Sequence, residues 1–98
     1  MKYTIEDIRN RISSQRAILS EDFCVKNLFL FGSYAKGLQN ENSDIDFLVE
    51  FSDDVDMFKM VDLQEFLTEL FNKKIDLGTP NGLKSFIKDN VLKEAVLI

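Results

Sequence analysis

The sequence has 98 residues, which suits one domain spanning 1–98, and its 45% hydrophobic content, with nine phenylalanines, can fill a single core. The formal net charge of −5 disfavours direct nucleic-acid binding, because an acidic surface repels phosphate backbones. The lone cysteine, Cys24, excludes an internal disulfide, and the lack of histidine excludes the common zinc ligand sets. With neither an apolar run of about 18 residues nor a signal peptide in view, we expect a cytoplasmic protein without a membrane span.

The N-terminal segment has the pattern of an amphipathic helix over residues 4–19. Thr4 is a suitable N-cap, and Glu6 and Asp7 stand in the first turn, where acids favour the positive end of the helix dipole. The apolar residues then fall on one stripe, formed by Ile5, Ile8, Ile12 and Leu19. We expect this single helix to end at residues 20–22 and to pack on a sheet.

The stretch from Leu28 to Phe51 predicts two strands joined by a polar turn. A first apolar run ends at Gly32-Ser33, and a second run follows Asp44-Ile45-Asp46. Side chains two residues apart on a strand share a face, so Asp44 and Asp46 are expected about 7 Å apart on one side. Beside the backbone N–H groups of the Gly-Ser turn, they can form a site for a divalent cation and a phosphate. Two aspartates at a solvated strand end produce the same pattern, so the spacing alone leaves both interpretations open.

A short helix, a loop and a long helix are predicted next. Residues 34–36 are expected to begin a short helix with its N-terminus toward the phosphates, and residues 38–42 form a polar loop. A helix over about 55–71 is indicated by apolar residues at helical spacing, namely Met57, Met60, Leu63, Phe66, Leu67 and Leu70. The acids at 53, 54 and 56 can cap that helix or hold a second cation. We prefer capping, since acids stabilise the positive end of the helix dipole.

The C-terminal third predicts a strand over residues 75–78 and a final helix. Asp76 lies between two apolar residues of the strand, which is compatible with a polar residue on an edge strand. A strand that follows a crossover helix is normally parallel and adjacent to the preceding strand, however, which would bring Asp76 near Asp44 and Asp46. Residues 79–82 form a turn into a helix with an apolar stripe at 83, 86, 87, 91 and 92. The apolar residues 95–98 are expected to pack on the core or against another chain.

One longer motif resembles a known family. Gly32-Ser33 followed after ten residues by Asp44-x-Asp46 is similar to the signature of the DNA polymerase beta-like nucleotidyltransferase superfamily. The string from Gly32 to Gly37, with Ser43 to Asp46, resembles its minimal nucleotidyltransferase (MNT) branch, and the likeness covers nearly the whole chain. Lys36 departs from the pattern, because the family more often has arginine there. Lysine keeps the charge but lacks the planar fork that grips two oxygens.

The resemblance implies a nucleotidyltransferase fold, an α+β arrangement of three to four strands in a small mixed sheet with helices packed on it. It implies ATP as substrate and two Mg²⁺ ions, held by Asp44 and Asp46 with Asp76 as the third ligand. Asp76 is then also the candidate general base. Gly32 would allow close approach of the triphosphate, and Ser33 would hydrogen-bond a phosphate, with Lys36 as a further phosphate contact.

The sequence motifs do not identify the group that accepts the nucleotide. The resemblance implies a hydroxyl on a partner, a tyrosine of a HEPN ribonuclease toxin, which would make this chain the antitoxin of a toxin–antitoxin pair. A small-molecule adenylyltransferase of the aminoglycoside type is an alternative, although such enzymes usually carry an additional helical domain. A protein that neutralises its partner by contact alone is the alternative outside the enzymes.

Overall fold

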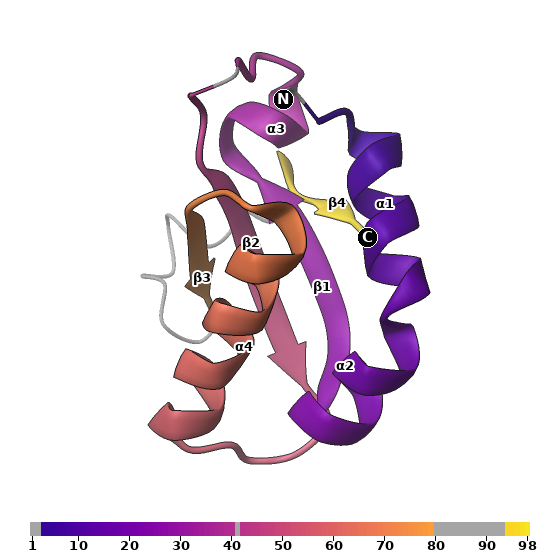
Figure 1. Ribbon diagram of the computed structural model, residues 1–98, viewed down its shortest axis with the longest axis vertical. Helices are drawn as coiled ribbons and strands as arrows, with labels where there is room; N and C mark the ends of the chain where they lie inside the picture. Colours follow the sequence, from indigo (N-terminus) through magenta and orange to yellow (C-terminus); the bar gives the residue numbers. More distant parts are fainter. Residues whose placement is uncertain (1–2, 41, 80–93) are drawn as a thin grey trace.

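The computed structural model describes residues 3–40, 42–79 and 94–98, which form a four-stranded sheet with helices (Figure 1). The strands are β1 (Val25–Phe31), β2 (Ile45–Phe51), β3 (Ile75–Gly78) and β4 (Val96–Leu97), and their spatial order is β3-β2-β1-β4. Strand β1 is antiparallel to β2 and β4, while β2 and β3 are parallel. The expected α+β fold with a small mixed sheet is confirmed.

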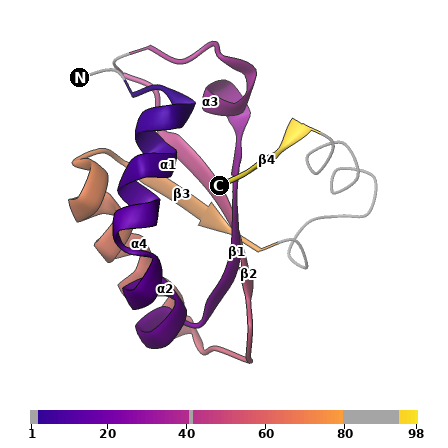
Figure 2. The ribbon, with the colours of Figure 1, turned by 90° about the vertical axis from the view of Figure 1, so that its right-hand side faces the viewer.

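The helices are α1 (Ile5–Ser14), α2 (Arg16–Phe23), α3 (Gly32–Lys36) and α4 (Met57–Phe71). Figure 2 shows α1, α2 and α4 together on one face of the sheet. Helix α4 connects β2 to β3, since parallel neighbours need a crossover connection rather than a tight turn. Among the described residues, no helix is long and apolar enough to cross a membrane.

The expected single N-terminal helix is wrong, because the structure has two helices separated at Gln15. The predicted cap is confirmed: the Thr4 hydroxyl accepts a hydrogen bond from the Asp7 N–H, and the Asp7 carboxylate accepts one from the Thr4 N–H. At the other end the Ser14 hydroxyl donates to the Arg11 carbonyl at 2.6 Å, a local bond that favours bending. Gln15 then leaves helical geometry at φ −115° and ψ 13°. Helix α2 continues through residues 20–22, where we expected the end.

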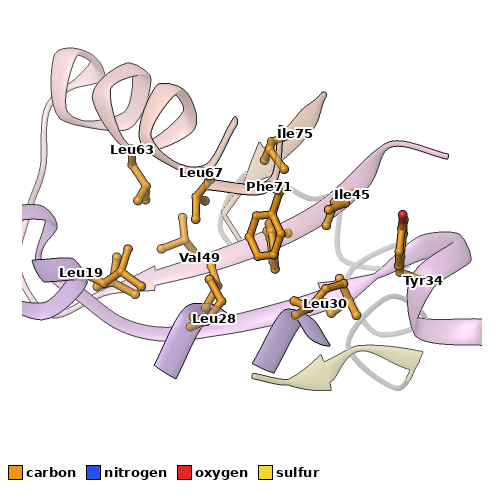
Figure 3. Close-up of a cluster of buried hydrophobic side chains, with 14 of the residues drawn as sticks. Leu19, Leu28, Leu30, Tyr34, Ile45, Val49, Leu63, Leu67, Phe71 and Ile75 are labelled. Carbon is orange, nitrogen blue, oxygen red and sulfur yellow. The ribbon is translucent and has the colours of Figure 1, made fainter. Parts of the chain in front are cut away.

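The core lies between the helices and the sheet (Figure 3). Alternate residues of β1 and β2 point into it, as strand geometry requires. Its fully buried members include Ile8, Ile12, Leu19, Leu28, Leu30, Tyr34, Ile45, Phe47, Val49, Leu63, Leu67, Phe71 and Ile75. The stripe expected on α4 is thus largely confirmed, with Met60, Phe66 and Leu70 partly buried at its edges.

Helix α4 begins two residues later than expected. Asp56 is its N-cap and accepts a hydrogen bond from the Lys59 N–H at 2.9 Å, which confirms the capping interpretation of the acids before it. Met57 does not extend the buried stripe as predicted but is 79% exposed. It lies about 120° around the helix from Leu63 at 100° per residue, which turns it away from the sheet.

The C-terminal residues pack on the sheet edge, in agreement with the first of the two expectations. Strand β4 pairs Leu97 with Phe29, and the Ile98 N–H donates to the Leu28 carbonyl. The Arg9 and Arg16 guanidinium groups donate to the last two carbonyls of the chain. The helix predicted through residues 83–92 lies outside the described residues.

Candidate functional site

Asp46 and Asp76 lie directly beside each other on neighbouring strands. In the parallel ladder of β2 and β3, Asp46 pairs with Asp76, as the crossover rule predicts. Adjacent strands are about 4.8 Å apart, and paired residues point to the same face. That face is opposite the core, because Ile45 and Phe47 on either side of Asp46 are fully buried under the helices.

The pKa of the Asp46 carboxyl is raised to about 6. Its partial burial is the largest cause, because desolvation disfavours the charged form. A hydrogen bond with Asp76 and the negative charges of Asp76 and Asp44 raise it further. The three candidate aspartates are therefore close enough to influence one another, and Asp46 is the member at their centre.

Asp44 differs from the other two in position and in partner. We expected Asp44 on the strand with Asp46, but it precedes the first residue of β2. Its Oδ2 lies 3.8 Å from the Lys74 ammonium. The Ile45 N–H donates to the Lys74 carbonyl, which ties the start of β2 to the residue before β3. Within the described part of the chain, no three acidic or thiol side chains stand close enough to surround a metal ion as they are placed.

Gly32 closes the site on the side of β1. It has a φ of +71°, and an added Cβ would collide with the Asp46 carboxylate. A side chain is excluded on both grounds, since L-residues rarely adopt that φ. From the sequence, Gly32 is expected to let a phosphate approach, and the structure adds that Asp46 occupies the space beside it.

Ser33 and Lys36 lie on α3, the helix that begins at Gly32. Ser33 is half-buried directly after Gly32, while the Lys36 ammonium lies 3.3 Å from the Glu94 carboxylate, with both side chains about half exposed. The Lys36 side chain is therefore partly exposed to solvent, with Glu94 as its ion-pair partner. Glu94 and Lys74 are charged partners of candidate residues that the sequence does not reveal, because neither belongs to the motif and each is far from its partner along the chain.

Tyr34 anchors the same helix in the core. Its ring is fully buried, and its hydroxyl, which lies near the Tyr3 backbone, makes no hydrogen bond of good geometry with the described residues. Burial raises the pKa of this phenol. Nearby, Gln39 donates to the Tyr3 carbonyl while its own buried side-chain oxygen is without a partner in the described part. The tyrosine thus fixes α3, and with it Gly32 and Ser33, against the sheet.

The chemistry of the three candidate carboxylates suits a magnesium ion, although as they are placed they do not surround one. All three candidate ligands are carboxylates, the oxygen donors that Mg²⁺ prefers. Burial and the neighbouring carboxylates raise the pKa of Asp46, and a cation bound beside it would favour the charged form again.

Comparison with known proteins places the chain among nucleotide-transferring enzymes. A family model for the nucleotidyltransferase domain matches residues 12–98. The chain belongs to this family. It is therefore an enzyme of the nucleotidyltransferase class, and the resemblance seen in its motif is confirmed.

Relatives of this nucleotidyltransferase are known by sequence and by structure. The protein adenylyltransferase MntA of Thermococcus cleftensis is 36% identical over 95 residues, covering 97% of this chain and 96% of the relative. A solved minimal nucleotidyltransferase matches with a TM-score of 0.81 and 26% identity, covering 96% of this chain and 95% of the other. A toxin–antitoxin structure with AMP-PNP matches with a TM-score of 0.71 and 27% identity, covering 90% and 69%. At 20% identity and a TM-score of 0.64, the complex of a tri-AMPylated HEPN toxin of Shewanella oneidensis with its MNT antitoxin supports the fold alone, covering 91% and 69%.

Proposed function

We propose that this nucleotidyltransferase moves AMP from ATP to a hydroxyl of a partner protein, and that Asp44, Asp46 and Asp76 carry the reaction. The observation that supports this most is the pairing of Asp46 with Asp76 on adjacent parallel strands, with Gly32 held against Asp46. Two facing carboxylates beside a glycine turn suit phosphoryl chemistry, in which catalysis is mostly positioning and charge compensation.

In the proposed mechanism, Gly32 and Ser33 bind the triphosphate. The glycine leaves room for the phosphates to approach the backbone, and the Ser33 hydroxyl donates a hydrogen bond to one of their oxygens. Lys36, which follows on the same helix and is paired with Glu94 in the structure, would add a positive charge to the phosphates once it leaves Glu94. These contacts orient the α-phosphorus for in-line attack.

Asp76 is the proposed general base. It is the exposed member of the carboxylate pair, so an incoming hydroxyl can reach it. The hydroxyl oxygen forms a bond to the α-phosphorus, its proton passes to Asp76, and the bond to pyrophosphate breaks. Magnesium, held by Asp44, Asp46 and Asp76, would lower the pKa of the hydroxyl and neutralise charge on the pyrophosphate.

The partner that we propose is a HEPN toxin, with a tyrosine as acceptor, which makes this chain an antitoxin. The relative from Thermococcus cleftensis is a protein adenylyltransferase, which supports a protein acceptor. The toxin–antitoxin structure with AMP-PNP supports both a nucleotide substrate and a protein partner. The HEPN class and the tyrosine come from the resemblance of the motif.

The test combines the purified chain, radiolabelled ATP, Mg²⁺ and the HEPN protein encoded beside it. We expect label on the HEPN protein, located at a tyrosine by peptide mass spectrometry, and none when Asp46→Asn replaces the wild type. Label on an aminoglycoside but not on the protein would establish the small-molecule alternative. A toxin that is silenced without acquiring label would establish neutralisation by contact.

A further inference from the structure

The negative charge of the chain is concentrated in one segment. Residues 50–69 contain seven acidic residues and one lysine, a net charge of −6, whereas the entire chain has −5. The remainder of the chain is therefore close to neutral. Six of the seven acids are exposed in the structure, namely Asp53, Asp54, Asp56, Asp62, Glu65 and Glu69.

The same segment exposes large apolar side chains at the start of α4. Phe58 is 80% exposed, Met57 is 79% exposed, and Val61 is 47% exposed. Phe58, Val61 and Glu65 recur at spacings of three and four residues, so they share the helix face opposite the buried Leu63 and Leu67. An outward stripe of this kind, rimmed by charge, is typical of a binding surface.

Two hollows follow this face. A cavity of about 500 Å³ lies where β2 ends and α4 begins, lined by Phe51, Val55, Met57 and Met60 together with Asp53 and Asp54. A second hollow of about 390 Å³ continues along α4, with Val61 and Glu65 in its lining. We call the outer face of α4 and these two hollows the α4 surface. The only lysine of the segment points elsewhere, because the Lys59 ammonium donates to the Asp22 carbonyl on α2.

Charge decides what can cover the α4 surface. A second copy that docked symmetrically through the same surface would bring a net −6 against a net −6, and nucleic acids or anionic membranes are repelled in the same way. A positively charged protein segment is attracted, and an apolar side chain on it can fill the first hollow beside Met57 and contact the exposed Phe58. We propose that the α4 surface docks a basic helix or strand of the protein that accepts AMP, so this inference rests on the proposed function for the identity of the partner.

The α4 surface is on the helix side of the sheet, whereas Asp46 and Asp76 point to the opposite side, and its first hollow is also far from Asp46 along β2. Phe51, at the cavity, is five residues from Asp46 along β2, about 17 Å at 3.3 Å per residue. Figure 1 shows α3 and the connection from β2 to α4 at opposite ends of the sheet. A partner can thus stay docked on the α4 surface while nucleotide enters and pyrophosphate leaves at the other end.

The experiment measures binding of the neighbouring HEPN protein to variants of this chain by calorimetry at low and high salt. Phe58→Ser removes the exposed anchor and should weaken Kd about tenfold or more. Glu65→Lys should weaken Kd at low salt and reduce the salt dependence of Kd. Both residues are exposed, so thermal melts should show that the fold is kept.

Matched controls make the same kinds of substitution on α1 and α2, away from the α4 surface. Ile18→Ser removes an exposed apolar side chain from α2, and Asn10→Lys with Ser13→Lys shifts the charge of α1 by the same two units that Glu65→Lys introduces on α4. Both controls should keep the wild-type Kd. Equal losses in controls and test variants would overturn the proposal, as would unchanged binding of Phe58→Ser and Glu65→Lys. Self-association of the wild type that Glu65→Lys alters would show that a second copy is the occupant and would also overturn it.

The readout also separates this inference from the proposed function. If the HEPN protein acquires no AMP but its binding still depends on Phe58, the transfer proposal fails and the docking proposal stands. If AMP is transferred and Phe58→Ser leaves the KM for the HEPN protein unchanged, the docking proposal fails and the transfer proposal stands.

Discussion

Asp46 meets three neighbours at once, and each explains part of its chemistry. Asp76 lies beside it on β3, and Asp44 adds a second negative charge. Its carboxylate also fills the space that a side chain at position 32 would need, so only glycine fits there. Partial burial raises the pKa of its carboxyl more than either charge does. A carboxylate in this position is the one most dependent on a cation, whereas Asp44 already has Lys74 at 3.8 Å.

We predict that Asp44→Asn, Asp46→Asn and Asp76→Asn each reduce AMP transfer by about 100-fold or more, because each removes charge that stabilises the transition state. Transfer is measured as initial rates with saturating ATP and Mg²⁺. Asp22→Asn on the exposed part of α2 is the control and should keep the wild-type rate. Wild-type turnover by Asp46→Asn would refute the assignment of the site.

We predict that Gly32→Ala destabilises the fold more than Gly37→Ala does. Both glycines have nearly the same backbone strain to impose on an alanine, with φ of +71° and +72°, which costs about 1–2 kcal/mol. Only at Gly32 does the new Cβ collide with Asp46, since nothing lies within 4 Å of a Cβ at Gly37. Urea unfolding of both variants gives the difference. Equal losses would show that the contact between Gly32 and Asp46 is relieved without cost.

Among the helices, two tyrosines join their segments to the surroundings in different ways. The Tyr3 hydroxyl donates to the Phe71 carbonyl at 2.7 Å and so connects the N-terminus to the end of α4, where the two rings also meet edge to face at 5.5 Å. The Tyr34 hydroxyl is buried on α3 and makes no hydrogen bond of good geometry with the described residues. Both tyrosine rings are buried in the core, but only the Tyr3 hydroxyl makes a clear hydrogen bond.

We therefore predict opposite effects for the same substitution at the two positions. Tyr3→Phe leaves the Phe71 carbonyl without its donor and should cost about 1–2 kcal/mol of unfolding free energy. Tyr34→Phe removes a buried polar group without a described partner and should be neutral or stabilising by up to about 1 kcal/mol. Chemical denaturation of both proteins provides the measurement. A clear loss for Tyr34→Phe would reveal a hydrogen bond to this hydroxyl.

Across the molecule, the arrangement of charge matters more than its sum. The acids at 53, 54 and 56 lie where β2 ends and α4 begins, and those at 62, 65 and 69 lie on the exposed face of α4, whereas Asp46 and Asp76 point to the other side of the sheet. Two lysines form ion pairs in this part of the fold: the Lys74 ammonium lies beside Asp44, and the Lys36 ammonium lies beside Glu94. The net charge of −5 therefore does not describe the site that binds phosphates in our proposal.

We predict that the metal-free protein loses stability as the pH rises from about 4 to about 6. The pKa of Asp46 is about 6 in the folded chain against 3.8 as the ordinary value, so the folded state holds the proton more tightly and is favoured at low pH. The loss should be about 1 kcal/mol, since solvent screens this half-exposed group. Thermal melts in EDTA across this range measure it.

Asp46→Asn should abolish that pH dependence and melt about 4–8 °C higher than the wild type in EDTA at neutral pH. Mg²⁺ should stabilise the wild type by mass action and the variant much less. Asp44→Asn is the comparison, and it should change stability little because it removes both a repulsion and the ion pair with Lys74. An Asp46→Asn protein that melts below the wild type in EDTA would contradict the interpretation that the Asp46 charge destabilises the metal-free fold.

The local elements and most of the candidate site could be predicted from the amino-acid sequence. Apolar runs bounded by a polar turn predict β1 and β2, helical spacing predicts α4, and the crossover rule brings Asp76 beside Asp46, because each of these depends on a short-range pattern or on chain connectivity. The motif of Gly32 and Ser33 with two aspartates is local as well, so the order of its residues along the chain is enough to match it to a family.

The inequality of the three aspartates, by contrast, depends on how the chain packs. Asp44 lies outside β2 and faces Lys74, whereas Asp46 is enclosed by Gly32 and Asp76, and nothing in the spacing of two residues distinguishes them. The same holds for the contact of Lys36 with Glu94 and for the exposure of Phe58. Burial and pairing between distant residues follow from the packing of helices on strands, and packing is a property of the whole chain, so one segment cannot reveal it.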